Sequence, residues 1–161
     1  MVKISTLFEE RKISKINELE IERYVNFFEN SYKDNLKHSK RNLNDFPRWS
    51  IISAYYAMHD ITKLLFAKKF SIKVDFEVHA TTVKLLKELL RNNVLSLLLE
   101  KGYKAFLSLA NDLDEAKKER TKVQYYTGTD FLKKEYALKA NEFFYDVVIK
   151  YIGKIKELLK W

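Results

Sequence analysis

Apolar residues recur along most of the chain at the three- and four-residue spacing that is typical of an amphipathic α-helix. The stripe in residues 13–40 consists of Ile21, Tyr24, Val25, Phe28 and Tyr32. The stripe in residues 48–69 includes Ile51, Ile52, Tyr55, Met58, Leu65 and Phe66. Pro47 directly precedes the second stripe, and proline suits the first turn of a helix. The spacing therefore predicts one helix over each range.

The middle of the chain has the pattern of a loop followed by a third helix. We expect residues 71–77 to form the loop, with Asp75 as the N-cap of the helix. The apolar stripe of that helix consists of Val83, Leu86 and Leu90. Residues 92–102, which begin with two asparagines, are expected to break or bend it.

Two more helices are predicted in the last third of the chain. The fourth runs from about Tyr103 to Gln124, and Gly128 supplies a stop before the next helix. The fifth runs from about Asp130 to Leu159. Its stripe consists of Tyr136, Ala140, Phe144, Val147 and Tyr151.

The composition supports an all-α fold. The chain has 161 residues but only three glycines and one proline. A β-sandwich or a doubly wound sheet needs many more turn-forming residues than that. The length suits one domain, residues 1–161, that buries roughly 70% of its unfolded surface. We therefore expect an up-and-down bundle of about five helices.

Several classes of protein are disfavoured. There is no apolar run of eighteen residues and no signal-peptide profile, so we expect no membrane span and a cytoplasmic location by default. Cysteine is absent, which removes disulfides and thiolate metal sites. The three histidines lack metal-ligand spacing, so we expect neither a metal nor a cofactor.

The charge balance is basic. The formal net charge is +8, from 30 Lys and Arg residues against 22 Asp and Glu residues. Clustered cations favour a phosphate-bearing partner, because binding releases counterions. Most of the cations alternate with acids along the predicted helices, so solvated helix faces are the simpler interpretation.

Arg120 interrupts the apolar stripe of the fourth predicted helix. It is in register with Leu109, Leu113, Ala116 and Val123, within a sector of roughly 80°. A buried arginine keeps its charge, so it must be paired or face a wet cleft. The candidate partners are an external anion, Asp60, Asp112, Glu119, and the hydroxyls of Tyr55 and Tyr56. The structural alternative is a guanidinium that reaches the edge of the bundle.

The histidines are the other candidates for chemistry. His59 lies within about 40° of Tyr55 and about 20° of Phe66 on the helical projection, so it faces the core. Its structural interpretation is a core histidine with one satisfied nitrogen. His79 is expected to be a surface or capping residue in the first turn of the third helix, and His38 is expected to be exposed.

Two stretches resemble the HEPN domain family, which is named for higher eukaryote and prokaryote nucleotide-binding proteins. They are SAYYAMHDITKLLFAKKF (residues 53–70) and EVHATTVKLLKELL (residues 77–90). Members of the family typically read Ala-Tyr-Tyr-Ala-Met in the second helix. Short archaeal and bacterial forms carry a second motif late in the fourth helix, to which Arg120, Val123, Gln124 and Tyr125 correspond. The resemblance covers roughly residues 15–155.

The resemblance implies a helical bundle and offers a ribonuclease mechanism. Many HEPN proteins are metal-independent ribonucleases, in which an arginine binds the phosphate and a histidine, separated from it by four to six intervening residues, moves a proton. Here Tyr125, Tyr126 and Thr127 stand at those later positions, and no histidine follows Arg120. Tyrosine is a poor general base at neutral pH.

We therefore expect a non-catalytic protein that binds a nucleotide, RNA or a partner protein through a cleft containing Arg120. The candidate ligand-binding residues are Arg120, Gln124, Tyr125, Tyr126, Tyr56 and Asp60. One alternative is a ribonuclease that uses Arg120 with His59 or Tyr125 as the substitute proton carrier. The other alternative is a structural helical interaction module.

The expected partners follow partly from the resemblance. Short HEPN proteins resemble the companions of minimal nucleotidyltransferases in toxin–antitoxin pairs, and they form homodimers. The chain itself has leucines on more than one face of a short segment: Leu85, Leu86, Leu89, Leu90, Leu95, Leu97, Leu98 and Leu99. Either a second chain or a tightly packed bend would bury them.

Overall fold

A computed structural model describes residues 4–120 and 129–160 of the chain. For residues 110–120 and 129–132 it describes the backbone and not the side chains. All statements about structure below refer to this described part.

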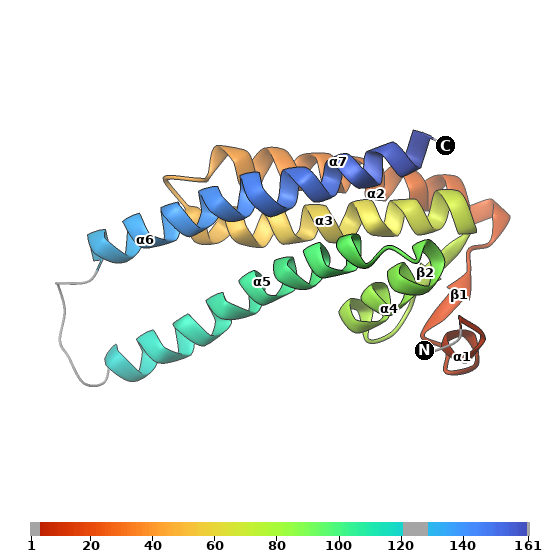
Figure 1. Cartoon of the computed structure of the whole chain (residues 1–161), viewed down its shortest axis with the longest axis horizontal. Helices are drawn as coiled ribbons and strands as arrows, with labels where there is room; N and C mark the ends of the chain where they lie inside the picture. Colours follow the sequence, from red (N-terminus) through yellow and green to blue (C-terminus); the bar gives the residue numbers. More distant parts are fainter. Residues whose placement is uncertain (1–3, 121–128, 161) are drawn as a thin grey trace.

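The fold is an all-α helical bundle, as the sequence predicts (Figure 1). Its elements are α1 (Ile4–Glu9), β1 (Ile13–Lys15), α2 (Glu18–Arg41), α3 (Pro47–Phe70), β2 (Ile72–Val74), α4 (Val78–Leu90), α5 (Asn93–Arg120), α6 (Thr129–Glu142), the π-helical turn η1 (Phe143–Val148) and α7 (Ile149–Lys160). The segments α6, η1 and α7 follow one another without a break and form one rod. None of the described helices combines the length and the apolar composition needed to span a bilayer.

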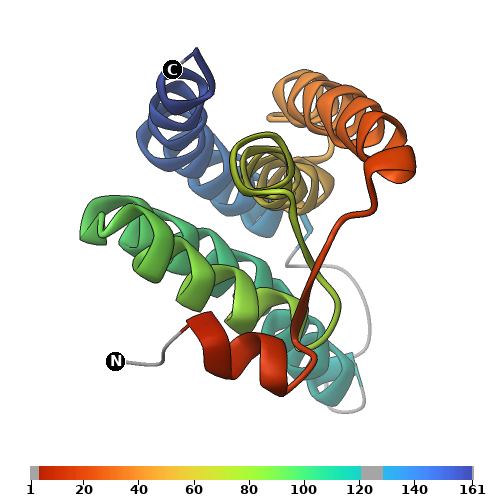
Figure 2. The same cartoon turned by 90° about the vertical axis from the view of Figure 1, so that its right-hand side faces the viewer.

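Helix α3 runs through the middle of the bundle, with α2, α5 and the α6–α7 rod around it (Figure 2). Most of its residues are buried, and Ala57, Met58, Ile61 and Phe66 are 0% exposed, whereas Trp49 and Tyr56 are exposed on one face. A helix that is apolar over most of its circumference packs in an interior, because each of its buried faces is removed from water. Pro47 opens the helix, so its predicted range of 48–69 is confirmed to within one residue at each end.

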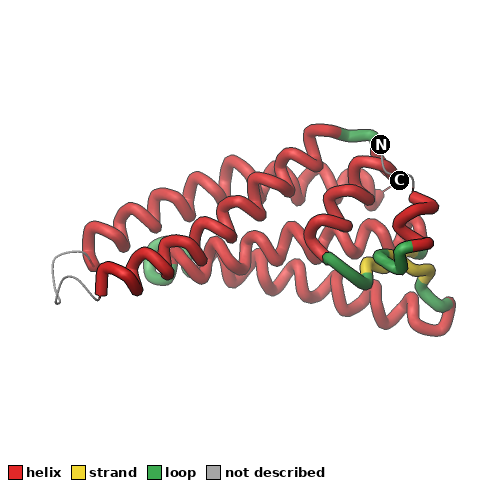
Figure 3. The backbone as a smooth tube through the Cα atoms, turned by 90° about the horizontal axis from the view of Figure 1, so that it is seen from below, coloured by secondary structure: helices red, strands yellow, loops and turns green. Residues whose placement is uncertain are grey.

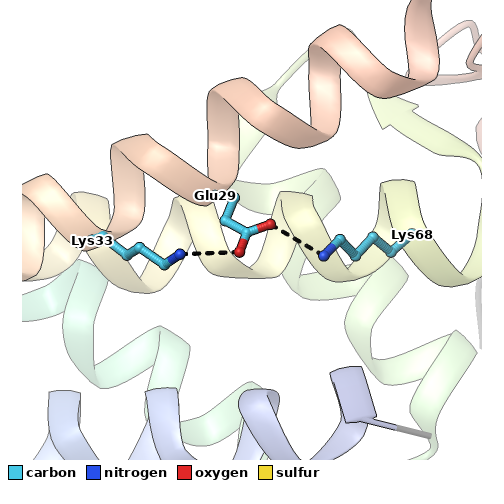
Figure 4. A network of polar contacts seen from close by, with 3 residues as sticks. All are labelled: Glu29, Lys33 and Lys68. Carbon is cyan, nitrogen blue, oxygen red and sulfur yellow. Dashed lines mark hydrogen bonds and ion pairs between the residues drawn. The ribbon is translucent and has the colours of Figure 1, made fainter.

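Helix α2 packs along α3 through its apolar stripe, in which Phe28 and Tyr32 are buried. Ion pairs add contacts at its surface (Figure 4). The carboxylate of Glu29 lies 3.0 Å from the ammonium of Lys33 on the same helix and 3.2 Å from that of Lys68 on α3. Exposed pairs of this kind contribute only about 0–1 kcal/mol each, so the apolar stripe holds the two helices together.

A two-stranded sheet lies at the end of the bundle near α1 and the end of α7 (Figure 3). Strand β1 pairs antiparallel with β2, and Ile13 lies opposite Val74. The predictions of a helix from residue 13 and of a loop over residues 71–77 are therefore wrong at these positions. Each strand is three residues long, which is too short for an alternating pattern to stand out against a helical one.

Two predicted helix starts are also wrong. Helix α4 is capped by Glu77 in a left-handed conformation, and the backbone N–H of Asp75 instead donates to the carbonyl of Lys12. A break after the third predicted helix is confirmed, but it covers only Arg91 and Asn92, and α5 starts at Asn93 and not at Tyr103. The reason is the side chain of Asn92, which accepts hydrogen bonds from the first backbone N–H groups of α5.

The predicted ends of the fourth helix and its stop, Gln124 and Gly128, lie outside the described residues. The fifth predicted helix corresponds to the α6–α7 rod, which contains a π-helical turn that the sequence did not indicate. A π turn advances the register by one residue, so it keeps Phe143, Phe144 and Val148 inside together with Tyr151.

The leucine-rich segment folds mostly into the chain itself. Leu85, Leu86, Leu95 and Leu99 are 0% exposed, and among the eight leucines only Leu97 is exposed. The tightly packed bend therefore accounts for most of this apolar surface. The homodimer stays a prediction.

Candidate functional site

Six rings gather where α3, α4 and α5 meet. We call them the ring cluster, and its members are Tyr55, Tyr56, His59, His79, Tyr103 and Phe106. Tyr55 is the central ring: the ring of Phe106 stacks on it at 5.0 Å between centroids, and the other four centroids lie 5.7–5.9 Å away. Three helices therefore supply one continuous aromatic contact.

His79 is the most tightly held ring of the cluster. Its imidazole stacks on the ring of Tyr103 with 3.4 Å between centroids, and its Nδ1 lies 2.6 Å from the hydroxyl of Tyr55. The expectation that His79 is a surface or capping residue is wrong. It faces α3 and α5 because α4 presents His79, Thr82 and Leu86 on the side that packs against them.

Both imidazoles of the cluster are neutral at pH 7. Burial lowers the pKa of His79 to about 4, and Glu100 partly opposes this shift. Burial also lowers the pKa of His59 to about 3, and the charges of Lys63 and His79 act in the same direction. Burial raises the pKa of Tyr55, so its hydroxyl keeps its proton. The cluster thus holds an uncharged Tyr–His hydrogen bond.

His59 is a buried core histidine, which is the structural alternative that the sequence offered for it. It is 5% exposed, its Nε2 lies 3.3 Å from the hydroxyl of Thr82, and it forms a hydrogen bond with the backbone of Val78. As a proton carrier for an external substrate it is less accessible than His79, which is half-buried.

Asp60 faces α2 and not α5. Its carboxylate accepts hydrogen bonds from the hydroxyl of Ser31 at 2.7 Å and from the amide of Asn35 at 3.0 Å. Burial raises its pKa, and these two hydrogen bonds oppose the shift. At 7% exposure it stabilises the α2–α3 contact, and the structure does not bring it to a ligand-accessible surface.

Tyr56 opens onto a surface of α3. It is 45% exposed, and its ring contacts the edge of Phe106 at 6.0 Å. Seven residues before it is Trp49, which is 60% exposed, and seven residues after it is Lys63, whose ammonium lies over the ring of Phe28 at 5.1 Å. Residues seven apart lie on one helix face, about 10 Å from each other. We call Trp49, Tyr56 and Lys63 the α3 face.

Arg120 is the last residue of α5, and its side chain lies outside the described residues. The same holds for the side chains of Asp112 and Glu119, and for Gln124, Tyr125 and Tyr126. Helix α5 diverges from α3 toward this end (Figure 1). Arg120 follows Tyr103 by 17 positions, which is about 26 Å along a regular helix. One chain therefore does not bring Arg120 to the ring cluster.

Comparisons of this chain with family models, with curated proteins and with solved structures found no match. The resemblance to HEPN domains accordingly rests on residues 53–70, residues 77–90 and the positions after Arg120. What the chain does must be argued from the ring cluster and the α3 face.

Proposed function

We propose that the chain is a HEPN-like helical protein that binds single-stranded RNA through the α3 face and does not cleave it. The observation that carries the proposal is the pair of exposed rings, Trp49 and Tyr56, on one face of the central helix, followed along that face by the half-buried Lys63, whose ammonium lies over the ring of Phe28. An aromatic ring stacks on a base of any sequence, and a nearby ammonium attracts the phosphate.

The energetics favour RNA over a purely structural role. Stacking one base on an aromatic side chain is worth about 1–3 kcal/mol. The net charge of +8 adds an attraction to the phosphates of RNA. This attraction weakens as the salt concentration rises, because the release of counterions on binding then gains less free energy. Single strands suit this face better than duplexes, because only unpaired bases can leave their own stack to cover a protein ring.

Replacing Tyr56 by alanine is expected to weaken binding of a fluorescent single-stranded oligonucleotide by about 5- to 150-fold, which is the loss of one stacked base. Fluorescence anisotropy at two salt concentrations measures it. The matched control is Tyr145→Ala, because Tyr145 is 52% exposed on η1 and lies off the α3 face.

Equal losses in both variants would contradict a defined site on α3. Equal affinity for a duplex of the same length would contradict base stacking. If the wild type binds no RNA at all, the structural interaction module becomes the better interpretation.

One observation favours ribonuclease activity as a second candidate. His79 is a half-buried, neutral imidazole whose Nδ1 lies 2.6 Å from the hydroxyl of Tyr55, and in the tautomer in which Nδ1–H donates to that oxygen, Nε2 is free to accept a proton. A pKa of about 4 makes it a weak base at neutral pH, which is why we rank binding first. Because Arg120 lies about 26 Å away along α5, catalysis by both residues needs two chains.

The ribonuclease candidate predicts complementation between inactive variants. His79→Ala and Arg120→Ala should each abolish cleavage of end-labelled RNA. Mixing the two variants should restore about a quarter of the activity. Half of the dimers are then mixed, and each mixed dimer has one of its two sites intact, formed by the His79 of one chain and the Arg120 of the other. Activity that survives either substitution, or that never returns on mixing, excludes this candidate. The further proposal of a nucleotidyltransferase companion rests on the resemblance.

A further inference from the structure

A second site is built where α5 leans away from the rest of the bundle. A cavity of about 300 Å³ opens there between α3, α5 and the α6–η1 segment. Its floor is apolar and includes Ile51, Leu109 and Phe143, each no more than 7% exposed. Its lining residues differ from those of the ring cluster and of the α3 face.

The size and lining suit a small organic molecule. Ligand sites in proteins start at about 300 Å³ and combine an apolar lining with a few polar groups. A cavity of about 150 Å³ holds one benzene ring, so this one accommodates a ring with a short side chain. The wall contributed by η1 is a π-helical turn, a rare geometry that is found often at functional sites.

The charged residues at the opening of the cavity determine which polar group a ligand should carry. Glu142 and Asp146 bring two carboxylates to the lining, and Lys139 brings one ammonium. That ammonium lies 2.9 Å from the carboxylate of Glu135, whereas Asp146 has only a long contact of 3.6 Å with Lys150. Among the described lining side chains, two carboxylates therefore stand against one ammonium that is already paired, and the guanidinium of Arg48 lies over the ring of the lining residue Tyr136 at 4.5 Å. The opening attracts a cation and repels a carboxylate.

We propose that this cavity binds a small aromatic amine, with the ring against Phe143 and Leu109 and the ammonium between Glu142 and Asp146. The apolar floor supplies affinity through buried area, and the two carboxylates supply the preference for a positive charge. The site is independent of RNA binding, because it uses other residues.

The test compares three ligands that share one ring. Calorimetric titration with 2-phenylethylamine, 2-phenylethanol and 3-phenylpropanoate should give the order amine, alcohol, carboxylate, with the amine at least fivefold tighter than the alcohol and detectable at about 1 mM. Glu142→Gln should reduce the preference of amine over alcohol and leave the affinity for the alcohol unchanged.

Ala105→Phe fills the cavity from α5 and should abolish binding of the amine without changing RNA binding. The control is Ala80→Phe, at an exposed alanine on α4. No binding of any of the three ligands by the wild type, or equal affinity for all three, would overturn the proposal. So would amine binding that survives Ala105→Phe.

Discussion

Tyr55→Ala is expected to lower the free energy of unfolding by about 3–5 kcal/mol, the cost of removing a large buried aromatic side chain. Tyr55 is 5% exposed and touches the rings of α4 and α5 as well as those of its own helix. Its removal leaves a cavity where three helices meet. A domain of this size has only about 5–15 kcal/mol of stability in total, so the variant should be close to unfolding.

Tyr55→Phe separates packing from hydrogen bonding at the same position. It keeps the ring and removes the hydroxyl that lies 2.6 Å from Nδ1 of His79. We expect a loss of about 1–2 kcal/mol, because a half-buried imidazole nitrogen loses its partner. Urea denaturation at pH 7, with the slope of the transition compared among the three proteins, measures both changes.

Two outcomes would contradict this account of Tyr55. If the phenylalanine variant loses as much stability as the alanine variant, the hydrogen bond and not the ring contact holds α4 in place. If the alanine variant loses less than about 1 kcal/mol, the junction of the three helices does not depend on the ring cluster.

The long helices could be predicted because their apolar stripes repeat over many turns. In α2 and α3 each turn adds another buried residue on the expected side, so single exceptions do not obscure the pattern. The strands β1 and β2 could not be predicted for the opposite reason. Three residues carry too little pattern, and Ile13 finds its partner at Val74, about 60 positions away in the sequence.

The site was predicted only in part. The burial of His59 is confirmed, and Tyr56, a candidate ligand-binding residue, is 45% exposed. His79 was missed, although its spacing from Thr82 and Leu86 matches one helix face and could have placed it inward. Tyr103 and Phe106 were missed because their role depends on how α5 crosses Tyr55, a tertiary contact that no local pattern encodes.

The two histidines of the cluster are expected to make the fold sensitive to acid. In the unfolded chain an imidazole has a pKa of 6.5, whereas the folded protein lowers the pKa of His59 to about 3. Above pH 6.5 neither state binds the proton, so this group has no effect on stability. As the pH falls below 6.5, the unfolded state binds a proton that the folded state excludes. Stability then falls by about 1.4 kcal/mol per pH unit until the pH approaches 3.

His59→Gln should remove this dependence while the amide keeps hydrogen-bonding capacity toward Thr82. Between pH 6.5 and 4.5 the wild type should lose about 2–3 kcal/mol more than the variant in urea denaturation. His79, whose pKa is about 4, acts in the same direction in both proteins, and Asp60, Lys63 and Glu100 are also common to them. His38→Gln, at an exposed histidine of α2 whose Nδ1 lies 2.7 Å from the hydroxyl of Ser53, is the control for the loss of an imidazole outside the cluster. Parallel curves for the wild type and His59→Gln would mean that this imidazole is hydrated in the folded state, and its enclosed position between Tyr55 and Thr82 would then be wrong.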